Sequence, residues 1–307
     1  MMARRPRGRD INGILLLNKS AGVTSNGALQ VAKRMFAGAK AGHTGSLDPL
    51  ATGMLPLCFG EATKFSQFLL DADKSYEVTA KLGVTTETGD ADGDVVATEP
   101  VTASAEEITT ALLSFVGDIE QIPSMYSAIK HEGQPLYKLA RQGIVVERKA
   151  RAVTIYSIDN ISVQEDEVSF FVSCSKGTYV RSLVEDLGAK LGCGGHVTAL
   201  HRTAVGPFQE DQMFTLDELG AAKQEGDFAA LDALLLPIDA AVRHWPAVML
   251  GPDASYYVRQ GQPVMAADRP TSGWVRMYDA EENEFLGVGE VQEDGMIAPR
   301  RLLAARR

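Results

Sequence analysis

Cysteine is scarce in this sequence, and long apolar runs are missing. The 307 residues include three cysteines, which lie far apart in the chain (Cys58, Cys174 and Cys193). An odd number at this spacing supports neither a disulfide framework nor a cysteine-rich zinc site, so we expect reduced, buried thiols in a cytoplasmic protein. No run of about eighteen apolar residues is present, which argues against a membrane-spanning helix. Arginines precede the apolar run 14–17, but that run is too short for a signal peptide and is typical of a buried strand.

Several catalytic signatures are also missing. The chain has no G-x-x-x-x-G-K-[ST] nucleotide loop and no G-x-S-x-G nucleophile elbow. Its five histidines include no His-x-x-x-His pair, and no H-x-E followed by P-C-x-x-C occurs, which excludes the zinc deaminases. We therefore expect no metal site. The side chains that remain for chemistry are carboxylates, arginines and aromatic rings.

Positive charge is in the minority. The formal net charge is −10, which by itself argues against a nucleic-acid partner, because phosphate neutralisation supplies most non-specific affinity for nucleic acids. The basic residues are clustered, however, near both ends (Arg4 to Arg9 and Arg300 to Arg307) and between Lys130 and Arg151. This distribution fits a surface with one basic side, and it equally fits solvated charge scattered over the whole surface.

The order of helix and strand patterns predicts a mixed α+β main domain. Residues 11–18 form a short apolar run that is typical of a central strand, and Thr24 or Ser25 can cap the helix that follows. Capping boxes that begin at Ser104 and Thr215 predict two further helices. Strands and helices alternate without strict βαβ regularity, so an α+β class is favoured.

The last quarter of the chain has a different pattern. Short strand-like pieces at 274–278, 285–291 and 296–298 are separated by turns. They predict a small β-rich domain that starts near Trp245. We therefore expect a main domain over residues 1–244 and a second domain over residues 245–307.

One loop stands out as a candidate for chemistry. Residues 42–53 read GHTGSLDPLATG, with Asp48 between glycines and followed by a proline. Glycine permits unusual backbone angles, and proline fixes φ and donates no N–H, so the loop can hold one carboxylate in place. An Asp-Pro pair is also common in ordinary turns, so local chemistry leaves both interpretations open.

A second acidic stretch invites a metal interpretation. Residues 83–95 read GVTTETGDADGDV, in which Asp90, Asp92 and Asp94 approximate a calcium loop. Gly93 precedes the third acidic position, however, and no glutamate falls at the closing position. A solvated hairpin or loop is therefore the favoured interpretation.

Five motifs in a fixed order resemble one family. They are GHTGSLDPLATGMLPLCFGEATK, KSYEVTAKLGVTTETGDADG, YSAIKHEGQPLYKLARQG, KGTYVRSLVEDLG and HRTAVGPF. Together they resemble the bacterial tRNA pseudouridine synthases of the TruB type, over about residues 12–208. The resemblance implies a mixed, mainly antiparallel sheet with flanking helices in the catalytic domain and a small PUA-like domain at the C-terminal end. It also implies an isomerase that needs no cofactor.

The resemblance implies three catalytic residues. Asp48 is implied to be the nucleophile, since a carboxylate can form a transient covalent adduct without a cofactor. Arg181, in KGTYVRSL, is implied to be its partner, because a nearby cation keeps a buried carboxylate ionised. Tyr76, in K-x-Y, is implied to stack on the uracil that is flipped out of the RNA. Without the motifs, Arg181 would be interpreted as a solvated helix residue and Tyr76 as a core tyrosine.

Further residues are implied to bind the substrate. His43 is implied to fill the place that the uracil leaves, Leu200 to line the base pocket and Lys19 to pack near the catalytic loop. Tyr179 and Arg202 lie in two of the same motifs and are implied to bind substrate too. A basic insertion over about residues 124–152 is implied to fold over the T-stem loop and to contact phosphates. Its contact residues are Lys130, Lys138, Arg141, Arg148 and Arg151.

The resemblance thus predicts an enzyme that converts the T-loop uridine at tRNA position 55 to pseudouridine. The predicted partner is the T-stem loop of tRNA, with no membrane and no small-molecule cofactor, and the protein is expected to act as a monomer. Two alternatives remain open at this point. One is an RNA chaperone that helps tRNA to fold, and the other is a glycosidase that uses Asp48 to release free uracil.

Overall fold

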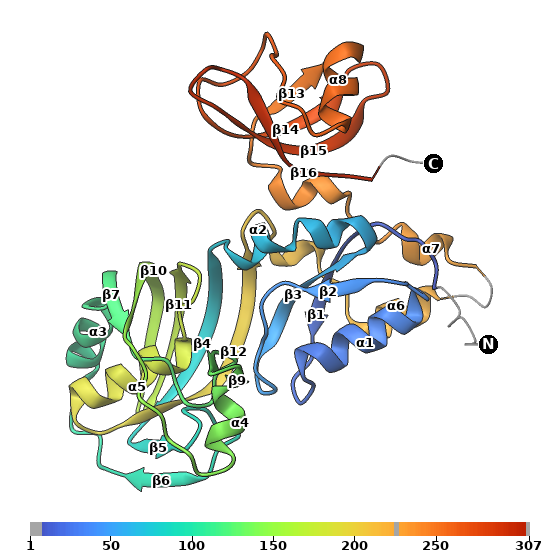
Figure 1. The fold of residues 1–307 in the computed structure, drawn as a ribbon. Coiled ribbons are helices and arrows are strands. Elements are labelled where there is room, and N and C mark those ends of the chain that lie inside the picture. Colours follow the sequence, from blue (N-terminus) through green and yellow to red (C-terminus); the bar gives the residue numbers. More distant parts are fainter. Residues whose placement is uncertain (1–7, 224–226, 305–307) are drawn as a thin grey trace.

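The computed structural model describes residues 8–223 and 227–304 (Figure 1). The basic residues that the sequence shows at 4–7 and 306–307 lie outside this described part. Within it, a long curved sheet crosses the molecule, helices pack against it, and a smaller β-rich unit sits above one end (Figure 1). The three cysteines are all free and buried, as predicted. No helix among the described residues is long and apolar enough to cross a membrane.

The main sheet contains eight strands among the described residues and is mostly antiparallel. Its order is β1-β3-β12-β4-β11-β10-β7, with β2 paired to β3, and only the β12–β3 pair is parallel. This confirms the predicted mixed, mainly antiparallel fold. The strands are β1 (Gly13–Lys19), β2 (Ala41–His43), β3 (Thr52–Phe59), β4 (Lys74–Leu82), β7 (Gly117–Gln121), β10 (Arg151–Gln164), β11 (Glu167–Cys174) and β12 (Gly195–Val205).

Strand β1 is buried on both faces, which explains its continuous apolar sequence. Leu15 and Leu17 point into one hydrophobic core, whereas Ile14 and Leu16 point into another on the opposite face. The expectation of a central strand is wrong, because β1 ends the sheet order. Its free edge is covered instead by single backbone bridges to Leu236 and Phe214. A strand covered in this way is as buried as a central one, so apolarity alone could not distinguish the two.

The helices begin where the sequence places capping residues. Thr24 caps α1 by accepting a hydrogen bond from the Gly27 N–H, and both predicted capping boxes, at Ser104 and Thr215, are formed. The helices of the main part are α1 (Ser25–Met35), α2 (Ser66–Leu70), α3 (Ala105–Leu113), α4 (Leu136–Ala140), α5 (Val180–Leu191), α6 (Leu216–Ala222) and α7 (Ala229–Asp232), with the 3-10 turns η1 (Gly60–Lys64), η2 (Glu210–Gln212) and η3 (Ile238–Val242).

Two small hairpins project from the main sheet. The first is formed by β5 (Val84–Thr86) and β6 (Val95–Thr98), and the acidic stretch forms the loop between them. The second is formed by β8 (Lys130–His131) and β9 (Gln134–Pro135), and α4 follows it directly. In Figure 1 the β5–β6 hairpin lies below α5, and β9 and α4 lie to the right of α5. This arrangement places the predicted basic insertion next to the N-terminal end of α5.

The C-terminal β-rich unit is a four-stranded sheet with its own core. Sequence patterns predicted three of its strands and missed the short β13 and the helix α8. An aromatic cluster joins this unit to the main part: Phe68 of α2 contacts Trp245 and Trp274, with ring centroids 4.9 and 5.3 Å away. The elements are β13 (Ala247–Leu250), α8 (Pro252–Arg259), β14 (Gly273–Asp279), β15 (Glu284–Val291) and β16 (Ile297–Leu302).

Candidate active site

The Asp48 loop connects β2 to β3 and is held by buried hydrogen bonds. The Ser25 hydroxyl, at the start of α1, donates to the Leu47 carbonyl (3.0 Å) and accepts from the Leu47 N–H (2.8 Å). Gly53 ends the loop at φ +96°, and a Cβ there would lie 2.4 Å from the Arg202 carbonyl oxygen. Glycine is therefore required where β3 approaches β12, and the loop is held at Leu47 and at its junction with β3.

Two buried cations, Lys19 and Arg202, also form hydrogen bonds to this loop and its ends. Lys19 donates to the carbonyls of Val23 (2.8 Å) and Pro49 (3.3 Å), and its burial lowers its pKa to about 8. Arg202 donates to the carbonyls of Met54 (2.7 Å) and Gly45 (3.0 Å). Both side chains are buried, at 1% and 2% exposure, and these hydrogen bonds to the main chain help to hold the loop in place. Direct contact of either residue with substrate stays a prediction.

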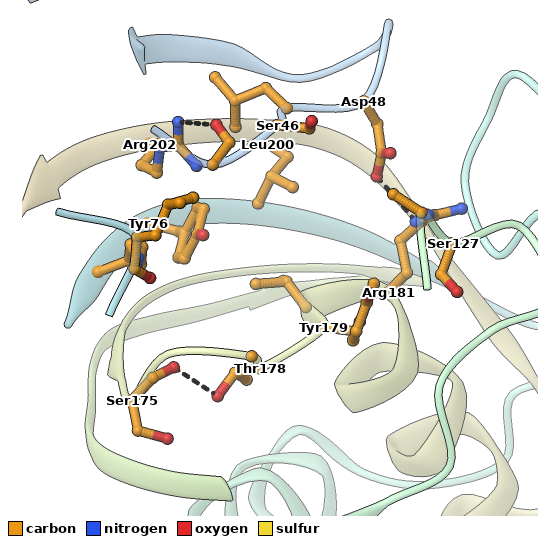
Figure 2. Close-up of a pocket in the computed structure, with 17 residues that line it drawn as sticks. Ser46, Asp48, Tyr76, Ser127, Ser175, Thr178, Tyr179, Arg181, Leu200 and Arg202 are labelled. Carbon is orange, nitrogen blue, oxygen red and sulfur yellow. Dashed lines mark hydrogen bonds and ion pairs between the residues drawn. The ribbon is translucent and has the colours of Figure 1, made fainter. Parts of the chain in front are cut away.

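Arg181 forms the ion pair that the motifs implied. Its Nε atom lies 3.0 Å from Oδ2 of Asp48, and the dashed line in Figure 2 marks this pair. Its Nη1 atom lies 3.4 Å from Oδ2 of Asp90 and donates to the Thr88 carbonyl (2.7 Å), while Nη2 donates to the Tyr126 carbonyl (3.0 Å). Because the residue is only 5% exposed, the interpretation as a solvated helix arginine is wrong.

Asp90 is a residue that sequence reasoning missed. The acidic stretch was expected to be solvated, but Asp90 is 5% exposed and faces Arg181. Its carboxylate also accepts hydrogen bonds from the Thr88 hydroxyl (2.5 Å) and the Asp92 N–H (3.2 Å), which close a tight turn. The second motif could have predicted an Asx-type turn at Asp90. No pattern in the sequence showed that the turn folds inward onto α5.

The protonation of Asp48 reflects two opposing influences. Burial raises the pKa of the Asp48 carboxyl, and the Arg181 guanidinium opposes that rise. The side chain is surrounded by protein yet keeps 41% of its surface open toward a cavity. A carboxylate that is held ionised by an arginine and open on one side can act as a nucleophile or as a base.

The cavity beside Asp48 has a volume of about 270 Å³, just below the usual range of roughly 300–1,000 Å³ for small-molecule sites. Tyr76 of β4 and Leu200 of β12 form its apolar wall, and Tyr179 closes the side nearest Arg181 (Figure 2). Ser175 and Thr178 lie at the end away from Asp48 (Figure 2). The cavity therefore combines an apolar wall with polar groups at both ends, near Asp48 and near Ser175.

Several lining residues had not been singled out from the sequence, among them three with polar side chains. Ser127, Thr178 and Lys74 all face this cavity or form its wall. Lys74 is buried, which lowers its pKa to about 8, and it donates to the carbonyls of Leu69 (3.3 Å), Leu70 (2.8 Å) and Ala72. All three residues lie inside the quoted motifs, so the motifs could have indicated them.

A second cavity of about 600 Å³ meets the first at Asp48. His43 lines this second space, together with Tyr126, Tyr137 and Arg141. Burial lowers the pKa of His43, and its Nδ1 atom is buried without a hydrogen-bond partner among the described residues. The structure thus places His43 and Arg141 near Asp48 but on the opposite side of it from Tyr76 and Leu200.

The other basic residues of the insertion are spread over separate places. Lys130, Arg148 and Arg151 line a third cavity of about 390 Å³, whereas Lys138 is exposed on α4. Arg148 donates to the Pro123 carbonyl (3.0 Å), so part of its guanidinium is already engaged. Phosphate contacts by these residues stay a prediction. In the described ranges, no group of three or more His, Cys, Asp and Glu side chains could hold a metal ion.

An arginine-paired aspartate on a loop of a mixed sheet, facing a cavity with an aromatic wall, defines a site at which a carboxylate can act as a nucleophile. Comparison with known proteins gives the particular family. Residues 33–180 match the family model of the TruB family pseudouridylate synthase N-terminal domain. Two further models match later parts of the chain: the tRNA pseudouridylate synthase B C-terminal domain at 181–243 and the pseudouridine synthase II TruB C-terminal model at 246–303. The chain therefore belongs to the TruB family of pseudouridine synthases.

Curated relatives are similar over nearly the whole chain. The tRNA pseudouridine synthase B of Tolumonas auensis is 54% identical over 306 residues, which cover 98% of this chain and 94% of the relative. The protein of the same name from Pseudomonas aeruginosa is 56% identical over 295 residues, covering 96% and 97%. Among solved structures, a Cbf5-Nop10-Gar1 complex contains a chain with a TM-score of 0.72 and 26% identity, covering 94% of this chain and 84% of that one. These similarities confirm the resemblance and the fold class.

Proposed function

We propose that this protein is a tRNA pseudouridine synthase that converts the T-loop uridine of tRNA to pseudouridine. The observation that carries the proposal is the 3.0 Å ion pair between Asp48 and Arg181 at the junction of two cavities. The curated relatives that bear the name tRNA pseudouridine synthase B support it, because they are more than half identical in sequence over nearly the whole chain.

Asp48 is the proposed nucleophile. The reaction breaks the bond between N1 of uracil and C1′ of ribose and forms a bond between C5 and C1′. The proton lost from C5 is balanced by the proton gained at N1, so no cofactor or external oxidant is needed. Arg181 keeps Asp48 ionised and fixes its direction, while Asp90 and two main-chain carbonyls hold Arg181.

The two cavities suit a nucleotide that is flipped out of its stacked position in the RNA. Tyr76 and Leu200 offer an apolar surface on which an extruded uracil can lie, which lowers the cost of unstacking. His43 and Arg141 face the second cavity and are proposed to contact the part of the RNA that the uracil leaves. Tyr179, between the ion pair and the aromatic wall, is proposed to contact the same nucleotide (Figure 2).

Recognition of the whole RNA is proposed to use the insertion at 124–152 and the C-terminal part. We propose residues 1–244 as the catalytic domain and 245–307 as a PUA-like RNA-binding domain. The partner is the T-stem loop of tRNA, and a single copy of the chain carries all the residues assigned here. A cytoplasmic location and a monomeric state stay predictions.

The test compares wild type with Asp48→Asn on unmodified tRNA, with pseudouridine mapped by position. We expect wild type to modify the T-loop uridine and Asp48→Asn to show no detectable product. Asp94→Asn, which changes an exposed aspartate of the nearby hairpin loop, is the control and should behave as wild type. Modification at another position would contradict the proposed substrate.

The same two proteins, wild type and Asp48→Asn, also test the two alternative functions, a glycosidase and an RNA chaperone. Release of free uracil, detected by chromatography, would indicate a glycosidase instead of an isomerase. If Asp48→Asn still supports the biological role in a complementation assay, the tRNA-folding activity is the one that the cell requires. If Asp48→Asn retains pseudouridine formation in the purified system, the assignment of the nucleophile is wrong.

A further inference from the structure

Gln121 is a buried amide with no role in the mechanism described above. It is the last residue of β7 and is only 1% exposed. Both of its polar atoms bind the main chain of one residue: Nε2 donates to the Tyr179 carbonyl (3.2 Å), and Oε1 accepts from the Tyr179 N–H (3.0 Å). A side-chain amide that pairs with both groups of one residue reproduces the pairing that a neighbouring strand would provide. Gln121 therefore fixes the main chain of Tyr179 at the end of the sheet.

The residue that Gln121 holds controls the start of α5. Tyr179 is the N-cap of this helix and makes no capping hydrogen bond with its own side chain. The first turn of a helix has N–H groups without partners inside the helix, so its position depends on outside contacts. Arg181 lies in that first turn, two residues after Tyr179, and its Nε atom is 3.0 Å from Asp48. A shift of Tyr179 would thus displace both a cavity wall and the partner of the nucleophile.

The segment after Gln121 makes further contacts with α5. The Ile122 carbonyl accepts from the Ser182 hydroxyl (3.5 Å), and the Tyr126 carbonyl accepts from Arg181 (3.0 Å). On its other side, this segment contacts the basic insertion. The Pro123 carbonyl accepts from Arg148 (3.0 Å), and the Ser127 carbonyl accepts from the Tyr137 N–H at the start of α4 (3.1 Å). Residues 121–127, which include the first residues of the insertion, therefore connect the rest of the insertion to the catalytic ion pair.

We propose that Gln121 is a positioning residue of the active site. Its amide sets where Tyr179 and Arg181 stand relative to Asp48, and it anchors the segment that joins the insertion to α5. The inference rests on the proposed function, since the measured reaction is pseudouridine formation. It assigns Gln121 no contact with the substrate.

The experiment measures kcat, KM and the pH dependence of kcat for Gln121→Ala on unmodified tRNA. We expect kcat to fall by roughly tenfold or more, because a small misplacement of catalytic groups is costly, while KM stays within about twofold. We also expect the acid limb of the kcat profile to move to higher pH. Arg181 opposes protonation of Asp48, so a displaced Arg181 leaves that carboxylate easier to protonate.

Two further variants make the result decisive. Gln121→Glu has the same shape and still accepts from the Tyr179 N–H, but when ionised it places a second acceptor against the Tyr179 carbonyl. We therefore expect kcat to fall in this variant as well. If Gln121→Ala does not fold, Gln121→Glu tests the proposal with the same measurements. Asp118→Ala is the matched control, because it removes a hydrogen bond to Thr154 (2.7 Å) between β7 and β10 without touching Tyr179. It should leave kcat and the acid limb unchanged.

The outcomes distinguish this inference from the proposed function. If wild type forms no pseudouridine, the proposed function fails. If wild type is active and both Gln121 variants keep its kcat and its acid limb, the positioning role is overturned. A loss that lies wholly in KM, or an equal loss in Asp118→Ala, would overturn it as well, because either result indicates weakened binding or general destabilisation.

Discussion

The guanidinium of Arg181 contacts four acceptors, which belong to three segments that are distant in sequence. Asp48 belongs to the β2–β3 loop, Asp90 and the Thr88 carbonyl to the β5–β6 loop, and the Tyr126 carbonyl to the insertion. Such fixed, planar donation is a property of arginine that lysine does not share. The direction of Asp48 therefore depends on all three segments at once.

At the residue scale, we expect Arg181→Lys to lower kcat by about a hundredfold, with a much smaller effect on tRNA binding. An ammonium group keeps the positive charge but cannot reach the four acceptors together. Single-turnover rates and filter-binding affinities would measure the two effects. Arg259→Lys is the matched control, since Arg259 also bridges carboxylates (Asp279, Glu282 and Glu284) but lies in the C-terminal part. Equal rates for Arg181→Lys and wild type would contradict the role of the guanidinium.

The pH dependence of the same pair has a defined sign. Burial raises the pKa of Asp48, so the nucleophile is lost as the pH falls through a value above that of a free aspartate. The guanidinium of Arg181 opposes this rise, and a poorly placed lysine would oppose it less. We expect the pH of half-maximal kcat on the acid side to be higher for Arg181→Lys than for wild type. An acid limb that moves to lower pH would contradict this account.

At the scale of elements, two helical glycines have opposite roles. Gly188 lies inside α5, where an added Cβ would stand 2.2 Å from the Gly194 carbonyl carbon, so it allows the helix to pack tightly on the start of β12. Gly220 lies in α6, and a Cβ there would meet nothing within 4 Å. Glycine is needed for packing at the first position and only weakens the helix at the second.

We therefore expect Gly188→Ala and Gly220→Ala to change stability in opposite directions. Gly188→Ala should lower the free energy of unfolding by about 1–3 kcal/mol through overpacking. Gly220→Ala should raise it by about 0.5–1 kcal/mol, because alanine loses less backbone entropy in a helix. Urea unfolding followed by circular dichroism measures both. A stabilising Gly188→Ala would show that α5 can move away from β12.

At the scale of the whole molecule, the junction between the two parts contains both tryptophans of the chain. Trp245 and Trp274 stack with centroids 5.0 Å apart, and Phe68 of the main part contacts each of them. Val288 of β15 belongs to the same hydrophobic core as Phe65 of the main part, and the rest of the C-terminal unit is built mostly on its own core. Tryptophan emission therefore reports directly on how the two parts are joined.

We expect Phe68→Ala to shift tryptophan emission to longer wavelength and to lower the free energy of unfolding by up to about 3 kcal/mol. The ring is only partly buried, so the cost should fall below that of a core phenylalanine. Fluorescence and circular dichroism, followed together during unfolding, would show whether the C-terminal unit separates first. Phe115→Ala, at a partly buried ring elsewhere in the main part, should leave the emission unchanged. Unchanged emission in Phe68→Ala would contradict the contact.

The distribution of charge over the whole molecule also matters, because a chain of net charge −10 is proposed to bind RNA. Arg141 is exposed, lines the second cavity and lies 5.6 Å from the Tyr137 ring centroid. We expect Arg141→Gln to weaken tRNA binding and to reduce the slope of log affinity against log salt by about one. Lys81→Gln, at the far end of β4 from Tyr76, is the control and should keep the slope. An unchanged slope in Arg141→Gln would show that this arginine contacts no phosphate.

The sequence by itself determined the features that depend on neighbouring residues. Helix starts at Thr24, Ser104 and Thr215 were predictable because a cap and its partner lie within three residues. The ordered motifs identified the family, and with it Asp48, Tyr76 and Arg181 as the residues to examine. Each of these carries its signal in a short stretch of chain.

The tertiary structure decided what those residues touch. Asp90 is buried against an arginine 91 positions away, β1 has its edge covered by residues beyond position 213, and the basic insertion is divided among separate cavities. None of this could be predicted from local patterns, because burial depends on segments that meet only after folding. An exposed acidic turn and one folded onto a buried arginine have the same local sequence, and only the packing of the β5–β6 loop against α5 distinguishes them.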